Sequence, residues 1–390
     1  MTTQILEERQ DSQARKRISI LHLTSSYLPQ IGGREFHIRD LATGLAKIGL
    51  FDVTILTGSN SSYSDTIENS VRVIRTPYHT IPLGGVLGYR IPHHIFQTVE
   101  RLKPDIIHSH DHFHSVSLIS ALLKRNSKLI LSCHSQIDFY DSKPLIRSVL
   151  KPYDFLIVPF LFHRSNLVTT FGNLRKSLSK FAPIVTSYGF IDTDYIDLTQ
   201  SVSVQELYGL EKFRTIFFCS RLERRKGAQD LIQAFKMIHT KHPDTFLIIS
   251  GPDAGELQSL RQQASNLQIK NILFTGAISD SVLHSTLKKS SVFVLPTHSD
   301  SAPAAILRAM YLGCPVISTT VGSIPKIIRD GFDGYLVKPQ DIHSLAYDIE
   351  LVLRDDNTFI ISNAKKKMES FTLKKYVEDT IRIYEKVLNE

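Results

Sequence analysis

The sequence predicts an α/β protein with two doubly wound parallel sheets. Two observations carry this prediction: short apolar segments alternate with longer amphipathic segments along the chain, and the pattern restarts near residue 214. Such alternation is typical of β-α-β units, in which helices cover a parallel sheet. The length of 390 residues also favours two domains over one.

The first half opens with an apolar strand at residues 18–23, followed by a loop that contains Gly32 and Gly33. Residues 35–48 have the periodicity of a helix, which we expect to end near Gly49. Further strands are expected at residues 53–56, 106–107, 128–132 and 167–169. These elements are expected to form β-α-β units of a parallel sheet.

The second half opens with an apolar strand at residues 215–219, then a basic loop and a helix from about residue 228. The other strands of this half are expected at residues 246–250, 272–275, 292–295, 316–318 and 335–337. A second sheet of this size predicts a second doubly wound domain.

A helix at residues 301–312 has well-marked ends. Ser301 can cap it, and Pro303 suits its first turn. Gly313 and Pro315 follow its last residue and end it.

These patterns predict a first domain at residues 17–197 and a second at 198–371, joined around residues 192–205. Residues 1–16 are polar and charged, without the apolar core of a signal peptide, and we expect a disordered tail. The last stretch, residues 372–390, is expected to be helical.

The composition favours a globular protein with anionic partners. The formal net charge is +8, and 42% of the residues are hydrophobic. No apolar run reaches the roughly 18–20 residues that a membrane-spanning helix needs, so we expect a cytoplasmic protein. Nothing in the sequence is typical of a nucleic-acid-binding module, which makes nucleic acid an unexpected partner.

The basic loop after residue 219 is the first candidate site. Its four cations are Arg221, Arg224, Arg225 and Lys226, between a buried strand and a helix. This places cations and backbone N–H groups at the carboxyl edge of a parallel sheet, where such folds bind ligands. A run of charged residues alone is more often a solvated surface than a binding site. The spacing of the basic residues in this loop therefore indicates a site only together with a second segment.

That second segment is Asp-Ser-Ala-Pro-Ala-Ala-Ile-Leu-Arg-Ala-Met at residues 300–310. Together with Ser-Arg-Leu-Glu-Arg-Arg-Lys-Gly at 220–227, it resembles the donor site of retaining glycosyltransferases of the GT-B architecture, the large fourth family also called group 1. The resemblance covers most of residues 17–370. It implies two Rossmann-like domains facing across a cleft, with the helix at 372–390 packing back onto the first domain.

The same resemblance implies a metal-independent, hexosyltransferase-like enzyme without a cofactor. The donor would be a nucleotide sugar, and the acceptor a glycan, a lipid-linked molecule or a small molecule. Arg221 and Lys226 correspond to ligands of the diphosphate. Asp300 corresponds to the acidic residue that holds sugar hydroxyls near the reacting carbon, and we take it as catalytic. The other donor-binding residues are expected to be Gly33, Ala302, Pro303, Ala304 and Arg308.

Position 308 departs from the family, which has a second acidic residue there to accept hydrogen bonds from the ribose. A guanidinium group only donates hydrogen bonds, so Arg308 cannot take that role. Three alternatives remain open. Arg308 swings away, it pairs with an acidic group such as Asp300 or one on the donor, or the donor has no ribose.

Two features of the first half are assigned by the same resemblance. The loop with Gly32 and Gly33 is expected to face donor phosphate and acceptor. His134 follows the strand at residues 128–132 and is expected beside the reacting carbon, as a catalytic residue. A lone histidine at a strand end is otherwise more often structural.

The run His-Ser-His-Asp-His-Phe-His at residues 108–114 has the spacing of a metal site, because residues two apart share one face of a strand. The family carries such a run without metal, so no metal is expected here. We expect a polar cleft edge, with His110 and His112 on the acceptor side.

Residues 142–164 mix basic and apolar side chains, and two interpretations stay open. The segment touches an anionic membrane, which would make the protein peripheral at the inner face, or it forms a buried helix pair with a basic outer surface. Two rival functions also stay open: a phosphorylase-like enzyme that uses a sugar phosphate, and a non-catalytic subunit that binds a glycan or a partner.

Overall fold

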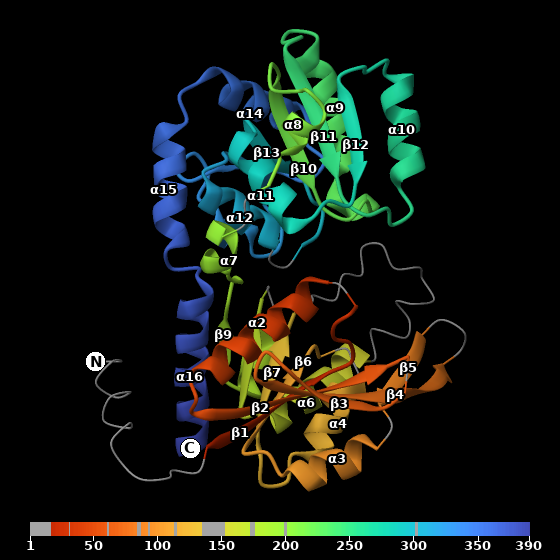
Figure 1. Cartoon of the computed structure of the whole chain (residues 1–390), viewed down its shortest axis with the longest axis vertical. Helices are drawn as coiled ribbons and strands as arrows, with labels where there is room; N and C mark the ends of the chain where they lie inside the picture. The colour runs from red at the N-terminus through yellow and green to blue at the C-terminus, as the bar shows by residue number, and fades with distance from the viewer. Residues whose placement is uncertain are drawn as a thin grey trace. The chain divides into compact units, whose positions relative to one another are not determined.

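The computed structural model describes residues 17–30, 32–60, 62–83, 87–92, 94–112, 115–134, 153–171, 176–198, 201–300 and 303–390. It is an α/β protein with two sheets, in which most neighbouring strands run parallel (Figure 1). The expected tail at residues 1–16 lies outside the described residues.

The chain divides into two compact units. Among the described residues, the first unit comprises 17–132, 156–168 and 383–390, and the second comprises 133–155 and 169–382. This division places residues 169–197 with the second unit, whereas the sequence led us to expect a boundary at 197/198.

The first sheet has nine strands in the order β3-β4-β2-β1-β6-β7-β8-β9, with β5 paired to β4. These strands are β1 (Ile18–Thr24), β2 (Phe51–Ser59), β3 (Ser64–Glu68), β4 (Val71–Leu83), β5 (Leu87–Pro92), β6 (Ile106–His110), β7 (Lys128–Cys133), β8 (Leu167–Thr170) and β9 (Ile184–Thr186). The five strands predicted from apolar runs are confirmed as β1, β2, β6, β7 and β8.

The first sheet is not wholly parallel, which corrects the prediction. Strands β3 and β5 both run antiparallel to β4. The β3–β4 hairpin turns at Asn69 and Ser70, whose φ angles of 49° and 66° are both positive. Two left-handed residues in a two-residue loop match the right-handed twist of a hairpin, so the chain returns directly without a crossover helix.

Helices of the first half that the structure describes are α2 (Gly33–Lys47), α3 (Ile95–Leu102), α4 (Ser115–Leu123) and α6 (Val158–Arg164). The predicted helix at residues 35–48 is confirmed as α2, which begins two residues earlier. In the first unit, the Tyr384 ring packs edge-on against Phe51 with their centroids 6.4 Å apart. Tyr384 belongs to the last helix, α16 (Leu373–Asn389).

The second sheet has six parallel strands in the order β12-β11-β10-β13-β14-β15. They are β10 (Arg214–Cys219), β11 (Thr245–Ser250), β12 (Ile272–Gly276), β13 (Val292–Leu295), β14 (Val316–Thr319) and β15 (Tyr335–Val337). All six strands predicted for this half are confirmed. Parallel strands buried on both faces leave nearly continuous apolar runs in the sequence, which explains why they were found.

Helices cover both faces of the second sheet (Figure 1). They are α8 (Val204–Leu207), α9 (Ala228–His239), α10 (Leu257–Asn266), α11 (Asp280–Lys289), α12 (Ala304–Leu312), α13 (Ile324–Ile327), α14 (Ile342–Arg354) and α15 (Thr358–Met368). α9 packs against α10 and α14, whereas α12 packs against α11 and α15. The expected joining segment is itself partly helical, since it holds α7 (Thr193–Leu198) and the start of α8.

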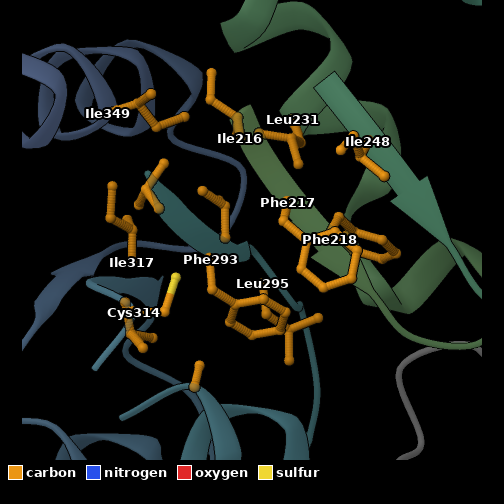
Figure 2. Packing of buried hydrophobic residues seen from close by; sticks show 14 of the residues in the cluster. Ile216, Phe217, Phe218, Leu231, Ile248, Phe293, Leu295, Cys314, Ile317 and Ile349 are labelled. Carbon is orange, nitrogen blue, oxygen red and sulfur yellow. The ribbon is translucent and has the colours of Figure 1, made fainter. Parts of the chain in front are cut away.

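The core of this unit lies on both sides of β10 and β13. Figure 2 shows Phe217 beside Phe293, and their rings meet edge-on with centroids 6.0 Å apart. On the other side of the sheet, Ile216 of β10 packs near Leu231 of α9 (Figure 2). Fully buried central strands of this kind hold the loops at their carboxyl ends in fixed positions.

The helix α12 starts later than predicted. Pro303 is its N-cap residue, with extended backbone and no side-chain cap, so it is not within the first turn as we expected. Ser301, the predicted cap, lies outside the described residues. The predicted end is confirmed: Gly313 follows the helix with φ of 80°, and its N–H binds the Ala309 and Met310 carbonyls.

Candidate functional site

The strand order of the second sheet puts its switch point between β10 and β13, the position at which open α/β sheets form a ligand-binding crevice. From β10 the chain winds outward to β11 and β12, and from β13 it winds the other way to β14 and β15. Neighbouring strands whose connections diverge leave a gap between their loops at the carboxyl edge, and ligands of open α/β sheets bind there. The two candidate segments, 220–227 and 300–310, follow these two strands.

The loop after β10 is shaped by Gly227. Residues Arg224–Lys226 form a single 3-10 turn, and Gly227 ends it with φ of 77° before α9 begins. A Cβ atom on Gly227 would lie 2.0 Å from the Pro296 carbonyl oxygen. Only glycine allows both this backbone conformation and this close approach of the two loops.

Backbone hydrogen bonds join the two loops across the crevice. The N–H of His298 donates to the carbonyl of Arg225 at 2.7 Å. The Arg225 guanidinium donates in turn to the Ser299 carbonyl at 3.0 Å. Arg225 therefore has a structural role in this arrangement, because it fixes the loop that carries Asp300.

Lys226 and Asp300 form an ion pair between the two loops. Their side chains are 9% and 14% exposed, so the pair is largely shielded from solvent. The sequence predicted both residues for the donor site, and the structure brings them together. A partly buried cation suits a diphosphate, and a carboxylate beside it can accept hydrogen bonds from sugar hydroxyls.

A second pair supports this loop. The His298 imidazole lies 2.6 Å from the Asp230 carboxylate of α9, and both side chains are 10% exposed. The sequence did not predict this pair, because no pattern around either residue indicates that the two side chains meet. It anchors the residues before Asp300 to the start of α9.

Arg221 differs from Lys226 in being open to solvent. Its side chain is 64% exposed, and its guanidinium lies 3.6 Å from Glu223. A long exposed cation at the mouth of the loop can reach a bound phosphate at little cost in desolvation.

Arg308 pairs with Asp280 of α11, not with Asp300. The guanidinium donates to the Asp280 carboxylate at 2.9 Å, and the two side chains are 24% and 35% exposed. Of the three alternatives left open by the sequence, the structure has the second, in which Arg308 pairs with an acidic group. The sequence had not identified Asp280 as that group. Asp280 comes from an element 28 residues away, which no local spacing indicates.

The remaining predicted donor residues lie at the start of α12. Pro303 is buried and Ala304 is exposed in the first turn of the helix. Ala302 lies outside the described residues.

In the first unit, the glycine loop leads directly into α2. A Cβ atom on Gly33 would meet no atom of the described residues within 4 Å, whereas one on Gly32 would collide with the Glu35 carboxylate. The space beside Gly33 is therefore open, as a ligand-facing position requires.

A polar network that the sequence did not reveal holds this loop. The Arg34 guanidinium donates to Glu35 at 2.9 Å and to Asp111 at 3.2 Å, and it also contacts the Ser26 hydroxyl. Burial by itself raises the pKa of Glu35, but the hydrogen bond from Ser26 and the charge of Arg34 outweigh this and lower it. Asp111 has φ of 76°, an uncommon conformation for a residue other than glycine.

The histidine run differs from the prediction. His110 and His112 are 0% and 2% exposed, so neither side chain forms the polar acceptor-side edge that we expected. His110 is covered because the residues of β6 are buried on both faces of the sheet, and His112, two residues beyond the strand, is buried as well.

His110 belongs instead to a buried cluster with His22 and His108. Nδ1 of His22 lies 2.9 Å from Nε2 of His110, and the rings of His108 and His110 stack 4.5 Å apart. Burial lowers the pKa of His22 to about 3, so this imidazole is neutral at pH 7. No pattern along the chain indicates that His22 joins the run.

These three histidines are the group within the described residues that could hold a metal ion, with ligand atoms within 4.8 Å of one another. Their nitrogens also make hydrogen bonds: His108 binds the Tyr384 hydroxyl and the Ser132 hydroxyl, each at 2.7 Å. A metal ion would have to displace such bonds. Absence of metal therefore stays a prediction, which elemental analysis can test.

His134 lies one residue beyond β7, at the strand end where we predicted it. Its ring stacks on Phe171, with centroids 4.7 Å apart and an angle of 13° between the planes. The stack fixes the orientation of the imidazole, which a positioned proton donor or acceptor also needs.

Of the segment that we considered for membrane contact, residues 142–152 lie outside the described residues. In the part that is described, Phe155 and Leu156 are 66% and 71% exposed. Among the helices that the structure describes, none has the length and apolar character needed to cross a membrane.

Two family models match the chain in succession. The model described as "Glycosyltransferase Family 4" matches residues 31–194, and the model described as "Glycosyl transferases group 1" matches residues 205–370. The chain belongs to the group 1 glycosyltransferases. The resemblance seen in the two loop segments is thereby confirmed, and with it the GT-B fold class.

Several curated glycosyltransferases are similar along nearly their whole length. The chain is 25% identical to the N-acetyl-alpha-D-glucosaminyl L-malate synthase of Bacillus anthracis, covering 93% of this chain and 96% of that protein. It is 24% identical to a glycogen synthase of Mycobacterium tuberculosis, covering 86% of each.

Solved structures share the fold at low identity. Sucrose-phosphate synthase from Thermosynechococcus elongatus matches with a TM-score of 0.75 and 18% identity, covering 96% of this chain and all of that one. The Anabaena protein HepE, in a complex with UDP and glucose, matches with a TM-score of 0.72 and 18% identity, covering 94% and 99%.

Proposed function

We propose that this group 1 glycosyltransferase moves a sugar from a nucleoside-diphosphate donor to an acceptor hydroxyl, with retention of configuration and without a metal ion. The observation that carries the proposal is the Lys226–Asp300 pair between the loops that follow β10 and β13. A cation that could bind phosphate and a carboxylate that could bind sugar hydroxyls lie side by side here, which supports a donor site at the switch point of the sheet. The UDP in the HepE complexes supports a nucleotide as the carrier of the sugar.

The leaving diphosphate gains negative charge as the bond from the anomeric carbon to its oxygen breaks. Lys226, the exposed Arg221 and the first N–H groups of α9 are placed to stabilise that charge. These groups do the work that a divalent cation does elsewhere. The acceptor oxygen then bonds to the anomeric carbon, and the acceptor proton passes to the departing diphosphate.

Asp300 accepts hydrogen bonds from the sugar once the diphosphate has taken over Lys226. His134, fixed by its stack on Phe171, acts near the reacting carbon. The acceptor would be a glycan, a lipid-linked molecule or a small molecule with a free hydroxyl.

The test is release of nucleoside diphosphate from a panel of UDP-, GDP- and ADP-hexoses, with water or candidate sugars and lipids as acceptors. We expect turnover of at least one donor, loss of turnover in Lys226→Ala, and no loss in Lys236→Ala, an exposed lysine in the last turn of α9. Proton NMR of the product then reports whether configuration is retained.

Two results would contradict the proposal. Bond cleavage that depends on inorganic phosphate, with no nucleotide sugar accepted, would favour the phosphorylase-like alternative. No turnover and no binding of any donor would favour a non-catalytic subunit.

A further inference from the structure

Two side-chain contacts join the segments that carry Lys226 and Asp300. The first is the ion pair between these two residues themselves. In the second, Nε2 of His298 lies 2.6 Å from the carboxylate of Asp230, in the first turn of α9. A carboxylate only accepts hydrogen bonds, so Nε2 carries the proton of this contact. Each segment thus contributes one acidic and one basic residue.

The two contacts respond differently to a bound diphosphate. In the proposed function, the phosphates take over the Lys226 ammonium, which ends its pairing with Asp300. The same proposal assigns no phosphate contact to His298 or Asp230, so their hydrogen bond persists when the donor is bound. Both side chains are 10% exposed, and solvent therefore competes with this hydrogen bond only weakly.

The helix α9 is a rigid support for the segment that carries Asp300. Leu231 and Ile232, in the first half of the helix, are fully buried in the core of the unit. The hydrogen bonds to and from Arg225 end on the loop before the helix. His298, in contrast, ties the segment to the helix itself, two residues before Asp300.

Resting on the proposed function, we propose that His298 is a positioning residue for sugar transfer. It acts through Asp230 and holds the Asp300 carboxylate at the sugar after the diphosphate has taken over Lys226. His298 therefore affects the rate of transfer and not the affinity for the diphosphate. Misplacing a group by about 1 Å can cost about 10²-fold in rate, which sets the scale of the effect.

Kinetics and calorimetry on variants of His298 test this proposal. With the best nucleotide sugar as donor, His298→Ala should lower kcat by roughly 10- to 100-fold. The same variant should bind inorganic pyrophosphate within about twofold of wild type, because Lys226 is intact. His298→Gln keeps an N–H donor near the position of Nε2 and should recover most of the lost kcat.

A double variant shows whether His298 acts through Asp230. Asp230→Ala and the double variant Asp230→Ala/His298→Ala should both have the kcat of His298→Ala, since the effects of two residues that act as one unit do not add. The double variant removes both partners, so it leaves no buried group that has lost its hydrogen bond and controls for destabilisation of the single variants.

His242→Ala is the matched control. It removes a histidine–carboxylate contact of the same kind in the same unit, in which Nε2 of His242 lies 3.4 Å from the Glu350 carboxylate. This variant should leave both kcat and pyrophosphate affinity unchanged.

The outcomes separate this proposal from the one on which it rests. Normal kcat in His298→Ala, in an enzyme that Lys226→Ala inactivates, overturns the positioning role alone. Equal losses of kcat and pyrophosphate affinity would make the contact merely structural, and a double variant slower than either single variant would show that His298 does not act through Asp230. Failure of the wild type to turn over any donor, or of Lys226→Ala to weaken pyrophosphate binding, overturns the donor site and the positioning role together.

Discussion

Asp300 competes with the phosphates of the donor for the Lys226 ammonium. Replacing Asp300 with an uncharged residue is therefore expected to increase the affinity for the phosphates. In the structure, the Lys226 ammonium is paired with the Asp300 carboxylate. A bound diphosphate has to take over that cation. Asp300→Asn removes the competing charge while keeping the size of the side chain, so pyrophosphate and nucleoside diphosphates should bind more tightly.

The magnitude follows from the chemistry of the pair. A hydrogen bond to a charged group contributes about 1.5–3 kcal/mol, and one between uncharged groups about 0.5–1.5 kcal/mol. Because the two side chains are only 9% and 14% exposed, solvent screens the pair weakly. We therefore expect a gain of about 1–1.5 kcal/mol, or roughly 5- to 15-fold in affinity.

The same variant should lose turnover, since the carboxylate is proposed to hold sugar hydroxyls at the reacting carbon. Opposite changes in affinity and rate are the diagnostic result, measured by calorimetry with pyrophosphate and by release of nucleoside diphosphate. Asp355→Asn removes one negative charge elsewhere in the same unit and controls for net charge. If Asp300→Asn binds pyrophosphate no more tightly than wild type, Asp300 does not compete for Lys226.

Three further predictions concern the histidines. His134→Ala should keep donor affinity but lose turnover by about 10²-fold or more. His134→Phe should keep the stack on Phe171 yet turn over as slowly as His134→Ala. Normal turnover in His134→Phe would make the residue structural. Elemental analysis of the purified protein should find well under one metal ion per chain, whereas one equivalent lost together with activity would assign His22, His108 and His110 as ligands. The pKa of His22 falls from 6.5 to about 3 on folding, so only the unfolded state takes up its proton below pH 6.5, and stability should fall as the pH drops from 7 to 5. Denaturation should show a loss of stability over this range, of which about 2 kcal/mol disappears in His22→Gln but persists in His163→Gln, a change at an exposed histidine; identical slopes in both variants would contradict it.

The second sheet was predictable because burial on both faces leaves a readable pattern. Each of its six strands is an apolar run in the sequence. Strands β3 and β5 were missed because they are antiparallel additions to β4, and Asn69-Ser70 lacks the glycine that usually marks a two-residue hairpin turn.

The residues of the candidate site were predictable only where their spacing along the chain indicates a binding loop. Lys226 and Asp300 each lie in the loop that follows a buried strand, and these loops meet at one edge of the sheet. Asp280 and Asp230 reach the site from other helices, 28 and 68 residues from their partners, and no local pattern marks them. The burial of His110 was missed for a similar reason, because its neighbour His22 comes from another strand.

The central claim is that Lys226 binds the diphosphate of the donor in the crevice between β10 and β13. Calorimetric titration of UDP, GDP and ADP into wild type, Lys226→Ala and Lys236→Ala tests it most directly. We predict that Lys226→Ala weakens the best nucleotide by roughly 10- to 150-fold, the loss of a charge-assisted contact of about 1.5–3 kcal/mol, and that Lys236→Ala binds like wild type. Equal affinity in all three proteins would contradict the claim.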